Sequence, residues 1–160
     1  MSGRRLDLPA VPDTRRLGET LGRMLRAGDL VVLTGGLGAG KTTLAQGIGE
    51  GLGVRGPVTS PTFVIARVHP STVAGPPLVH VDAYRLGGAP ELDDLDLDAA
   101  VEESVTVVEW GHGIAEGLAE DRLEIVLEAD PGTEKRTAVV TARGGRWSDD
   151  DLAPLGGVPC

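Results

Sequence analysis

Three short apolar runs alternate along the chain with polar and glycine-rich stretches. They cover residues 30–33, 78–81 and 105–108, and each contains at least two valines. Runs this short and rich in β-branched residues are typical of strands that are buried on both faces, as in a parallel sheet. The pattern therefore predicts an α/β protein in which right-handed crossovers join the parallel strands, and residues 63–68 read as a further strand.

Apolar residues recur at helical spacing in two places. The first predicted helix begins after Asp13, which is placed as its N-cap, and ends before Gly28. The second follows the glycine-rich segment and ends at Gly53. A short edge strand at residues 6–8 and a short helix around residues 114–118 complete the predicted elements.

The pattern changes in the C-terminal third. Residues 122–128 and 136–142 alternate apolar and polar positions around a Pro-Gly turn, which predicts an antiparallel hairpin. Residues 148–160 carry three acids and no base, and we expect them to form a disordered acidic tail. The sequence thus predicts one domain over residues 1–147, with a mainly parallel sheet flanked by helices and a C-terminal antiparallel hairpin.

Charge and cysteine content exclude several classes of protein. The formal net charge is −9, from 15 basic and 24 acidic residues, and an acidic surface repels phosphate backbones. A protein that binds nucleic acid unaided is therefore not expected. The one cysteine, Cys160, excludes an internal disulfide scaffold, and no apolar run approaches the roughly 20 residues of a membrane span. We expect a soluble cytoplasmic protein.

The segment GGLGAGKT at residues 35–42 carries the clearest chemistry. It fits the pattern G-x-x-x-x-G-K-[ST], in which glycines let backbone N–H groups curl around an anion and the following helix adds its positive end. Lys41 would reach the phosphates, and the Thr42 hydroxyl is a hard oxygen ligand for Mg²⁺. A strand is predicted before this segment and a helix after it, so the context agrees with a nucleotide-binding P-loop.

A metal held by such a loop needs a second acidic group, and two candidates stand at strand ends. Asp82 follows the run at residues 78–81, and Glu109 follows the run at residues 105–108. Each could equally be an ordinary exposed acid that ends a strand. The spacing does not decide which of the two is the acid on the metal side.

Missing residues narrow the choice of nucleotide. The chain has no asparagine, so it lacks the Asn-Lys-x-Asp loop that recognises guanine, and its one glutamine, Gln46, lies on the predicted helix after the loop. ATP is therefore favoured over GTP. A small-metabolite kinase would carry several arginines over the phosphates, whereas Arg85 stands alone between Arg67 and Arg122. The kinase remains the alternative reading, and a non-catalytic, nucleotide-dependent interaction module is a third.

Four blocks in a fixed order resemble the TsaE (YjeE) family, the small P-loop ATPases of bacterial tRNA threonylcarbamoyladenosine biosynthesis. The blocks are GAGKTT at residues 38–43, TSPTF at 59–63, HVDAYRL at 80–86 and VEWG at 108–111. The similarity extends over about residues 14–142. The chain departs from the family after Trp110, where Gly-His-Gly stands in place of the proline or glycine and charged residues that often follow.

The resemblance implies a role for each matching residue. Thr42 and Glu109 would hold Mg²⁺, Asp82 would orient the attacking water, and Lys41 would neutralise phosphate charge during catalysis. The residues implied to contact the nucleotide are Gly36, Gly38, Ala39, Gly40, Lys41, Thr42, Thr43, Ser60, Thr62 and Trp110, to which the hairpin adds Arg136 as a residue that could reach the base or the phosphates.

The resemblance also implies a biological role. The chain would be a weak Mg-ATPase that binds the TsaD–TsaB pair and supports repeated rounds of tRNA modification. It would reach tRNA only through that complex, which agrees with its net charge of −9.

Overall fold

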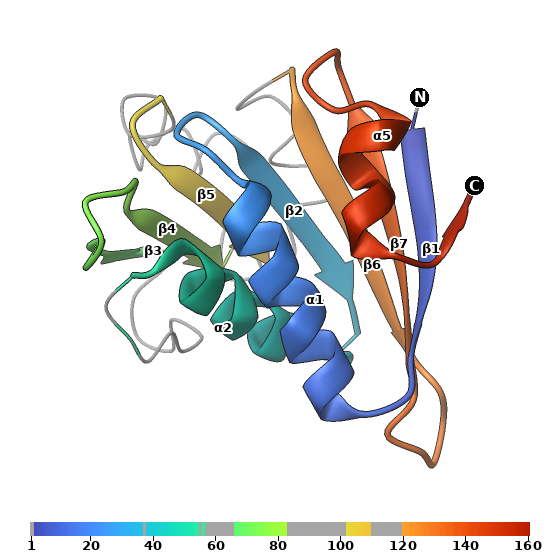
Figure 1. The fold of residues 1–160 in the computed structure, drawn as a ribbon. Helices are drawn as coiled ribbons and strands as arrows, with labels where there is room; N and C mark the ends of the chain where they lie inside the picture. The colour runs from blue at the N-terminus through green and yellow to red at the C-terminus, as the bar shows by residue number, and fades with distance from the viewer. Residues whose placement is uncertain (1, 37, 55, 57–65, 83–101, 110–119) are drawn as a thin grey trace.

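The computed structural model describes residues 2–36, 38–54, 56, 66–82, 102–109 and 120–160 (Figure 1). Its centre is an eight-stranded sheet in the order β3-β4-β5-β2-β6-β7-β1-β8. The strands are β1 (Ser2–Leu8), β2 (Leu30–Gly35), β3 (Ala66–His69), β4 (Leu78–Asp82), β5 (Val105–Glu109), β6 (Arg122–Ala129), β7 (Arg136–Arg143) and β8 (Val158–Pro159). The helices are α1 (Val11–Met24), α2 (Lys41–Leu52), α5 (Asp149–Leu152) and the 3₁₀ turn η3 (Ala153–Leu155).

The parallel part of the sheet is built from β4, β5, β2 and β6. β2 pairs in parallel with β5 on one side and with β6 on the other, and β4 pairs in parallel with β5. All five residues of β5 and the first four of β2 are buried, as expected for strands covered on both faces. The predicted α/β class and its three valine-rich strands are confirmed.

The antiparallel part of the sheet contains the predicted hairpin, since β6 pairs with β7 across the turn between Ala129 and Arg136. β7 also pairs antiparallel with β1, and β3 pairs antiparallel with β4 at the opposite end of the sheet. The prediction of an edge strand at residues 6–8 is wrong in extent and place. β1 is seven residues long and lies between β7 and β8, because the end of the chain returns to pair with it.

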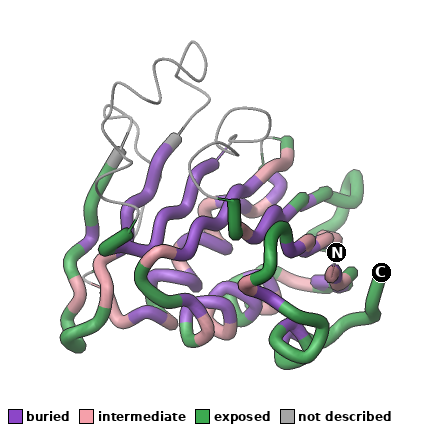
Figure 2. The backbone as a smooth tube through the Cα atoms, turned by 90° about the horizontal axis from the view of Figure 1, so that it is seen from above, coloured by how far each residue is buried: buried purple, intermediate pink, exposed green. Residues whose placement is uncertain are grey.

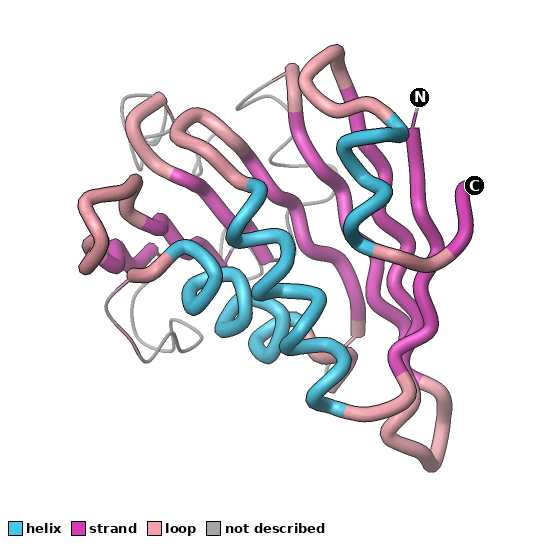
Figure 3. The backbone as a smooth tube through the Cα atoms, viewed as in Figure 1, coloured by secondary structure: helices cyan, strands magenta, loops and turns pink. Residues whose placement is uncertain are grey.

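α1 and α2 lie side by side against one face of the sheet (Figures 1 and 3). Glycines line their contact: a Cβ added to Gly47 would come within 2.2 Å of the Arg15 carbonyl oxygen, and one added to Gly18 within 2.4 Å of the Leu44 carbonyl oxygen. Gly22 and Gly51 are equally close to the facing helix. Glycine is costly inside a helix, and here it allows the two backbones to touch.

The ends of the helices were predicted with mixed success. α1 begins three residues earlier than expected, with Ala10 as its N-cap, and Asp13 lies in the first turn, where its carboxylate accepts a hydrogen bond of 2.9 Å from the Ala10 N–H. Asp13 therefore acts as the return half of a capping box. Gly28 is not the C-cap of α1 but lies in the turn before β2, with φ of +94°. α2 ends at Gly53 as predicted, with φ of +76°.

The prediction of a disordered tail at residues 148–160 differs from the structure. Ser148 caps α5 by accepting a hydrogen bond of 3.2 Å from the Asp151 N–H, and η3 and β8 follow. Leu152 and Leu155 are buried against the core together with Trp147. The acids had suggested disorder, but they occupy the first turn of a short helix whose apolar side chains supply the stabilising contacts.

Burial is concentrated in the middle of the sheet and on the inner faces of the helices, whereas the exposed segments lie mainly in the connections (Figure 2). The described helices include none that is long and apolar enough to cross a membrane. The first part of the strand predicted at residues 63–68 and the helix predicted around residues 114–118 lie outside the described residues.

Candidate functional site

The glycine-rich loop connects the end of β2 to the start of α2. Gly38 and Gly40 have φ of +76° and +104°, which side chains with a Cβ rarely adopt. A Cβ on Gly36 or Gly38 would meet nothing within 4 Å, so this side of the loop faces open space. On its other side the loop is tightly packed, since a Cβ on Gly35 would lie 2.6 Å from the Leu127 carbonyl oxygen of β6.

Lys41 is the first residue of α2, and its side chain is folded into the loop. It is only 6% exposed, and its Nζ donates hydrogen bonds of 2.7 Å to the Gly35 carbonyl oxygen and 2.9 Å to the Gly36 carbonyl oxygen. The ammonium group is thereby held beneath the loop. A buried positive charge beside a helix N-terminus forms a strongly anion-attracting position.

The other residues of the loop shape this position. Ala39 is buried, and its N–H donates a hydrogen bond of 3.1 Å to the Gly36 carbonyl oxygen, which closes the turn. Thr42 and Thr43 follow Lys41 in the first turn of α2, and both are half-buried. The backbone N–H groups of a first helical turn have no partner within the helix, so this end of α2 can donate to an anion.

The two candidate acids lie on neighbouring strands. Asp82 and Glu109 are register partners at the carboxyl ends of the parallel strands β4 and β5, and Leu33 of β2 is the partner of Glu109 on the other side. Glu109 therefore lies beside Leu33, which is two residues before Gly35, where the loop begins. Its carboxylate is buried and forms a hydrogen bond with His80 Nε2.

Arg136, at the start of β7, joins the hairpin to the loop. Its guanidinium donates a hydrogen bond of 3.0 Å to the Gly38 carbonyl oxygen, and it also binds the carbonyl oxygens of Lys135 at 3.0 Å and Thr133 at 3.2 Å. The contact brings together residues that are 98 positions apart in the chain. The structure thus places Arg136 at the loop, and its contact with the base or the phosphates of a nucleotide stays a prediction.

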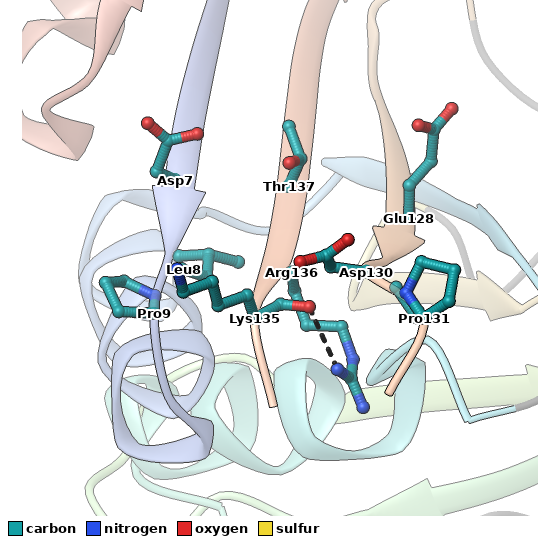
Figure 4. A pocket seen from close by; sticks show the side chains of 10 residues that line it. Asp7, Leu8, Pro9, Glu128, Asp130, Pro131, Lys135, Arg136 and Thr137 are labelled. Atoms are coloured by element: carbon teal, nitrogen blue, oxygen red, sulfur yellow. Dashed lines mark hydrogen bonds between the residues drawn. The ribbon is translucent and has the colours of Figure 1, made fainter. Parts of the chain in front are cut away.

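A pocket of about 520 Å³ opens next to Arg136, between β1, the end of β6 and the start of β7 (Figure 4). Its walls combine apolar and charged groups, and they are formed by Asp7, Leu8, Pro9, Glu128, Ala129, Asp130, Pro131, Lys135, Arg136 and Thr137. Sequence reasoning missed this pocket, since its walls come from three segments with no motif in common. The Pro-Gly turn at residues 130–132 predicts a hairpin but carries no signal for a pocket.

Three of the predicted site residues lie outside the described residues, namely Ser60, Thr62 and Trp110. The described residues contain no group of three or more His, Cys, Asp and Glu side chains arranged to hold a metal ion.

The described residues fit both a nucleotide and Mg²⁺. Open glycines, the buried Lys41 and the end of α2 form a cradle for phosphate oxygens. Thr42 and Glu109 could supply hard oxygen ligands, and Mg²⁺ bound with nucleotides characteristically uses only one or two protein side chains beside phosphate oxygens and water. A closed cage of three or more ligands is not required.

Comparison with known proteins gives a consistent result. The family model described as "Threonylcarbamoyl adenosine biosynthesis protein TsaE" matches residues 8–138. This chain belongs to the TsaE family. Among its curated relatives, the tRNA threonylcarbamoyladenosine biosynthesis protein TsaE of Streptomyces coelicolor is 60% identical over 147 residues, covering 89% of this chain and 99% of the relative. That of Bacillus subtilis is 39% identical over 136 residues, covering 84% and 83%.

A solved structure agrees with the fold of this TsaE family member. The crystal structure of Bacillus subtilis YdiB superposes with a TM-score of 0.78 at 32% identity, covering 97% of this chain and 95% of the other. The resemblance to TsaE inferred from four sequence blocks is confirmed, as is the α/β fold with its antiparallel C-terminal strands. The family role is tRNA threonylcarbamoyladenosine biosynthesis.

Proposed function

We propose that this TsaE family protein binds Mg-ATP at the glycine-rich loop and hydrolyses it slowly in support of tRNA threonylcarbamoyladenosine synthesis. The observation that carries the proposal is the loop itself. Its open glycines and the buried Lys41 ammonium lie together at the N-terminus of α2. That combination serves as a P-loop for the phosphates of a nucleotide.

The pocket beside Arg136 supports a nucleoside rather than a free phosphate. Arg136 touches the loop at Gly38 and also lines the pocket, so a ligand with its phosphates in the loop can extend into a space of about 520 Å³. The apolar side chains of Leu8 and Pro9 suit the flat face of a base, and the acids on the rim suit ribose hydroxyls. The chain has no asparagine for a guanine-recognising loop, which favours adenine.

Two residues would hold the metal. The Thr42 hydroxyl and the Glu109 carboxylate are the oxygens we assign to Mg²⁺, which would neutralise charge on the phosphates. Asp82 stands in register with Glu109 at the same strand end. We assign it to orienting water, a role that leaves nucleotide affinity nearly unchanged when the carboxylate is removed.

The partners we propose are the TsaD and TsaB proteins, with the complex acting in the cytoplasm. The net charge of −9 disfavours direct binding of tRNA, so the chain would reach its RNA only through the complex. Its ATP turnover would reset the complex between rounds. The small-metabolite kinase is the alternative, and it requires a phosphate acceptor but no protein partner.

The test combines hydrolysis with complex formation. Asp82→Ala should keep Mg-ATP affinity within a few-fold and lower hydrolysis by about 10²–10⁴-fold, the usual range for a positioned acid–base group. Gel filtration with TsaD, TsaB and Mg-ATP should then show the variant retained in the complex. Failure of the wild type and the variant to co-elute under every nucleotide condition would contradict the proposed partners. Phosphate transfer to a small acceptor without the partners would favour the kinase.

A further inference from the structure

His80 is a buried residue for which neither the fold nor the proposed hydrolysis has yet required a role. It lies in the middle of β4, and its side chain is fully buried. Its Nε2 is hydrogen-bonded to Oε2 of Glu109, the carboxylate assigned to the metal. A fully buried imidazole in contact with a buried carboxylate is a costly arrangement that folding alone does not demand.

The register of the sheet explains how the two side chains meet. His80 pairs with Val107, and the next residue on the same face of β5 is Glu109. Val107 belongs to the core that α1 and α2 cover, as does Leu78 on β4. By strand alternation both side chains therefore point to the helical face of the sheet. The His80 imidazole is thus a diagonal neighbour of the Glu109 carboxylate across the pair of strands β4 and β5.

Among the described residues, the His80 ring has one hydrogen-bond partner, the Glu109 carboxylate. A carboxylate in its ionised form can only accept, and toward that form of Glu109 the donor of this hydrogen bond is His80 Nε2. The other ring nitrogen, Nδ1, is buried and has no hydrogen-bond partner among the described residues. Buried polar atoms are usually paired, so the position forgoes one hydrogen bond while keeping the contact with Glu109.

We propose that His80 is a positioning residue that holds the Glu109 carboxylate in the orientation required for the metal of the bound nucleotide. The inference rests on the proposed function. Partners in the outer shell of a metal ligand fix its rotamer, and their removal typically lowers metal affinity 10–100-fold. The hydrogen bond from His80 Nε2 would restrain rotation of the Glu109 side chain before any ligand binds.

A purely structural pair would behave differently, and three variants separate the two roles. His80→Gln can place an amide N–H near the position of Nε2, whereas His80→Asn places it near that of Nδ1. Both are polar and smaller than histidine. Val81→Ala is the control, since Val81 is equally buried on the same strand but points to the opposite face, where it pairs with Val108.

For each variant, calorimetry would measure ADP binding in EDTA and then Mg²⁺ binding to the ADP-loaded protein, and thermal unfolding would measure stability. We expect His80→Asn to weaken Mg²⁺ binding by 10–100-fold and to keep metal-free ADP binding within about twofold. His80→Gln should restore Mg²⁺ affinity to within about threefold. Val81→Ala should lower the melting temperature without moving Mg²⁺ affinity.

Two results would overturn the inference. One is unchanged Mg²⁺ affinity in His80→Asn, and the other is an equal loss in His80→Asn, His80→Gln and Val81→Ala. A wild-type protein that binds no ADP in EDTA would instead contradict the proposed function, so the two failures are distinguishable.

A measurement on the wild type keeps the test independent of whether the variants fold. In the ¹⁵N spectrum of the imidazole, Mg²⁺ added to the ADP-loaded protein should move the Nε2 signal of His80 more than that of Nδ1. Absence of any shift at saturating Mg²⁺ would overturn the inference.

Discussion

The two halves of the sheet contribute to the site in different ways. The parallel half, made of β4, β5 and β2, brings the end of β5 at Glu109 next to β2, which leads into the glycine-rich loop, and the end of β4 at Asp82 next to Glu109. The antiparallel half, made of β7, β1 and β8, contributes Arg136 and most of the walls of the pocket. β6 joins them, running parallel to β2 and antiparallel to β7.

The comparison teaches that strand direction decides which chemistry a half can hold. Parallel neighbours end at the same edge, so acids that follow different strands meet there. Antiparallel neighbours alternate in direction, so at this edge the antiparallel half offers the turn between β6 and β7 and the end of β1. The parallel half therefore carries the groups we assign to phosphate and metal, and the antiparallel half carries the groups we assign to the nucleoside.

The largest expected effect comes from Lys41, in the parallel half. Lys41→Ala should weaken ATP binding by at least about 100-fold, because it removes the ammonium group held beneath the loop by two carbonyl oxygens. Lys135→Ala, at the other lysine of the chain, is the matched control and should change affinity only a few-fold, since that residue is exposed on the pocket rim. Fluorescence titration with a labelled ATP analogue would measure both, and equal losses would contradict the division between the halves.

A second prediction concerns the glycines at the contact between α1 and α2. Gly47→Ala should lower the free energy of unfolding by about 2–3 kcal/mol, despite alanine's better helix propensity of about 1 kcal/mol, because its Cβ would lie 2.2 Å from the Arg15 carbonyl oxygen. Gly145→Ala is the control, since a Cβ there meets nothing within 4 Å. Urea unfolding would measure both, and an unchanged midpoint for Gly47→Ala would show that α1 and α2 are not closely packed.

A smaller effect is expected in the antiparallel half. Arg136→Ala should weaken ATP binding about tenfold, since the guanidinium joins the pocket to the Gly38 carbonyl oxygen. Arg136→Lys should not restore it fully, because an ammonium cannot reproduce the planar fork that spans three carbonyl oxygens. Affinity for inorganic triphosphate, which lacks a nucleoside, should fall less than affinity for ATP. An equal loss of affinity for both ligands would indicate that Arg136 contacts the phosphates and not the nucleoside.

The smallest effect is expected at the C-terminal segment. Ser148→Ala should cost about 1 kcal/mol or less of stability through loss of the cap on α5. The backbone N–H of Ser148 and, secondly, its hydroxyl donate to the Asp151 carboxylate and hold the pKa of that group below its usual value of 3.8, and Ser148→Ala removes the contribution of the hydroxyl. This contribution is present above pH 4 and is lost as the pH falls and Asp151 becomes protonated. The difference in melting temperature between wild type and Ser148→Ala should therefore narrow in acid, and a constant difference would contradict this linkage.

Sequence reasoning was accurate where short-range pattern carries the information. Valine-rich runs located the parallel strands β2, β4 and β5, and alternation around a Pro-Gly turn located the hairpin. It failed at residues 148–160, where the acidic composition predicted disorder and the few apolar residues gave no helical pattern. Leu152 and Leu155 are too few and too close to the chain end to predict a helix, yet their burial against the core gives this segment its structure.

The candidate site divides in the same way. Residues 35–42 by themselves determine the loop that we propose for phosphate binding, because glycine φ values, a lysine and a helix start are all local properties. That Glu109 meets His80, that Arg136 reaches Gly38 and that a pocket lies beside them was decided by the tertiary structure alone. Each of these contacts joins segments far apart in the chain, and no local pattern encodes the strand order that brings them together.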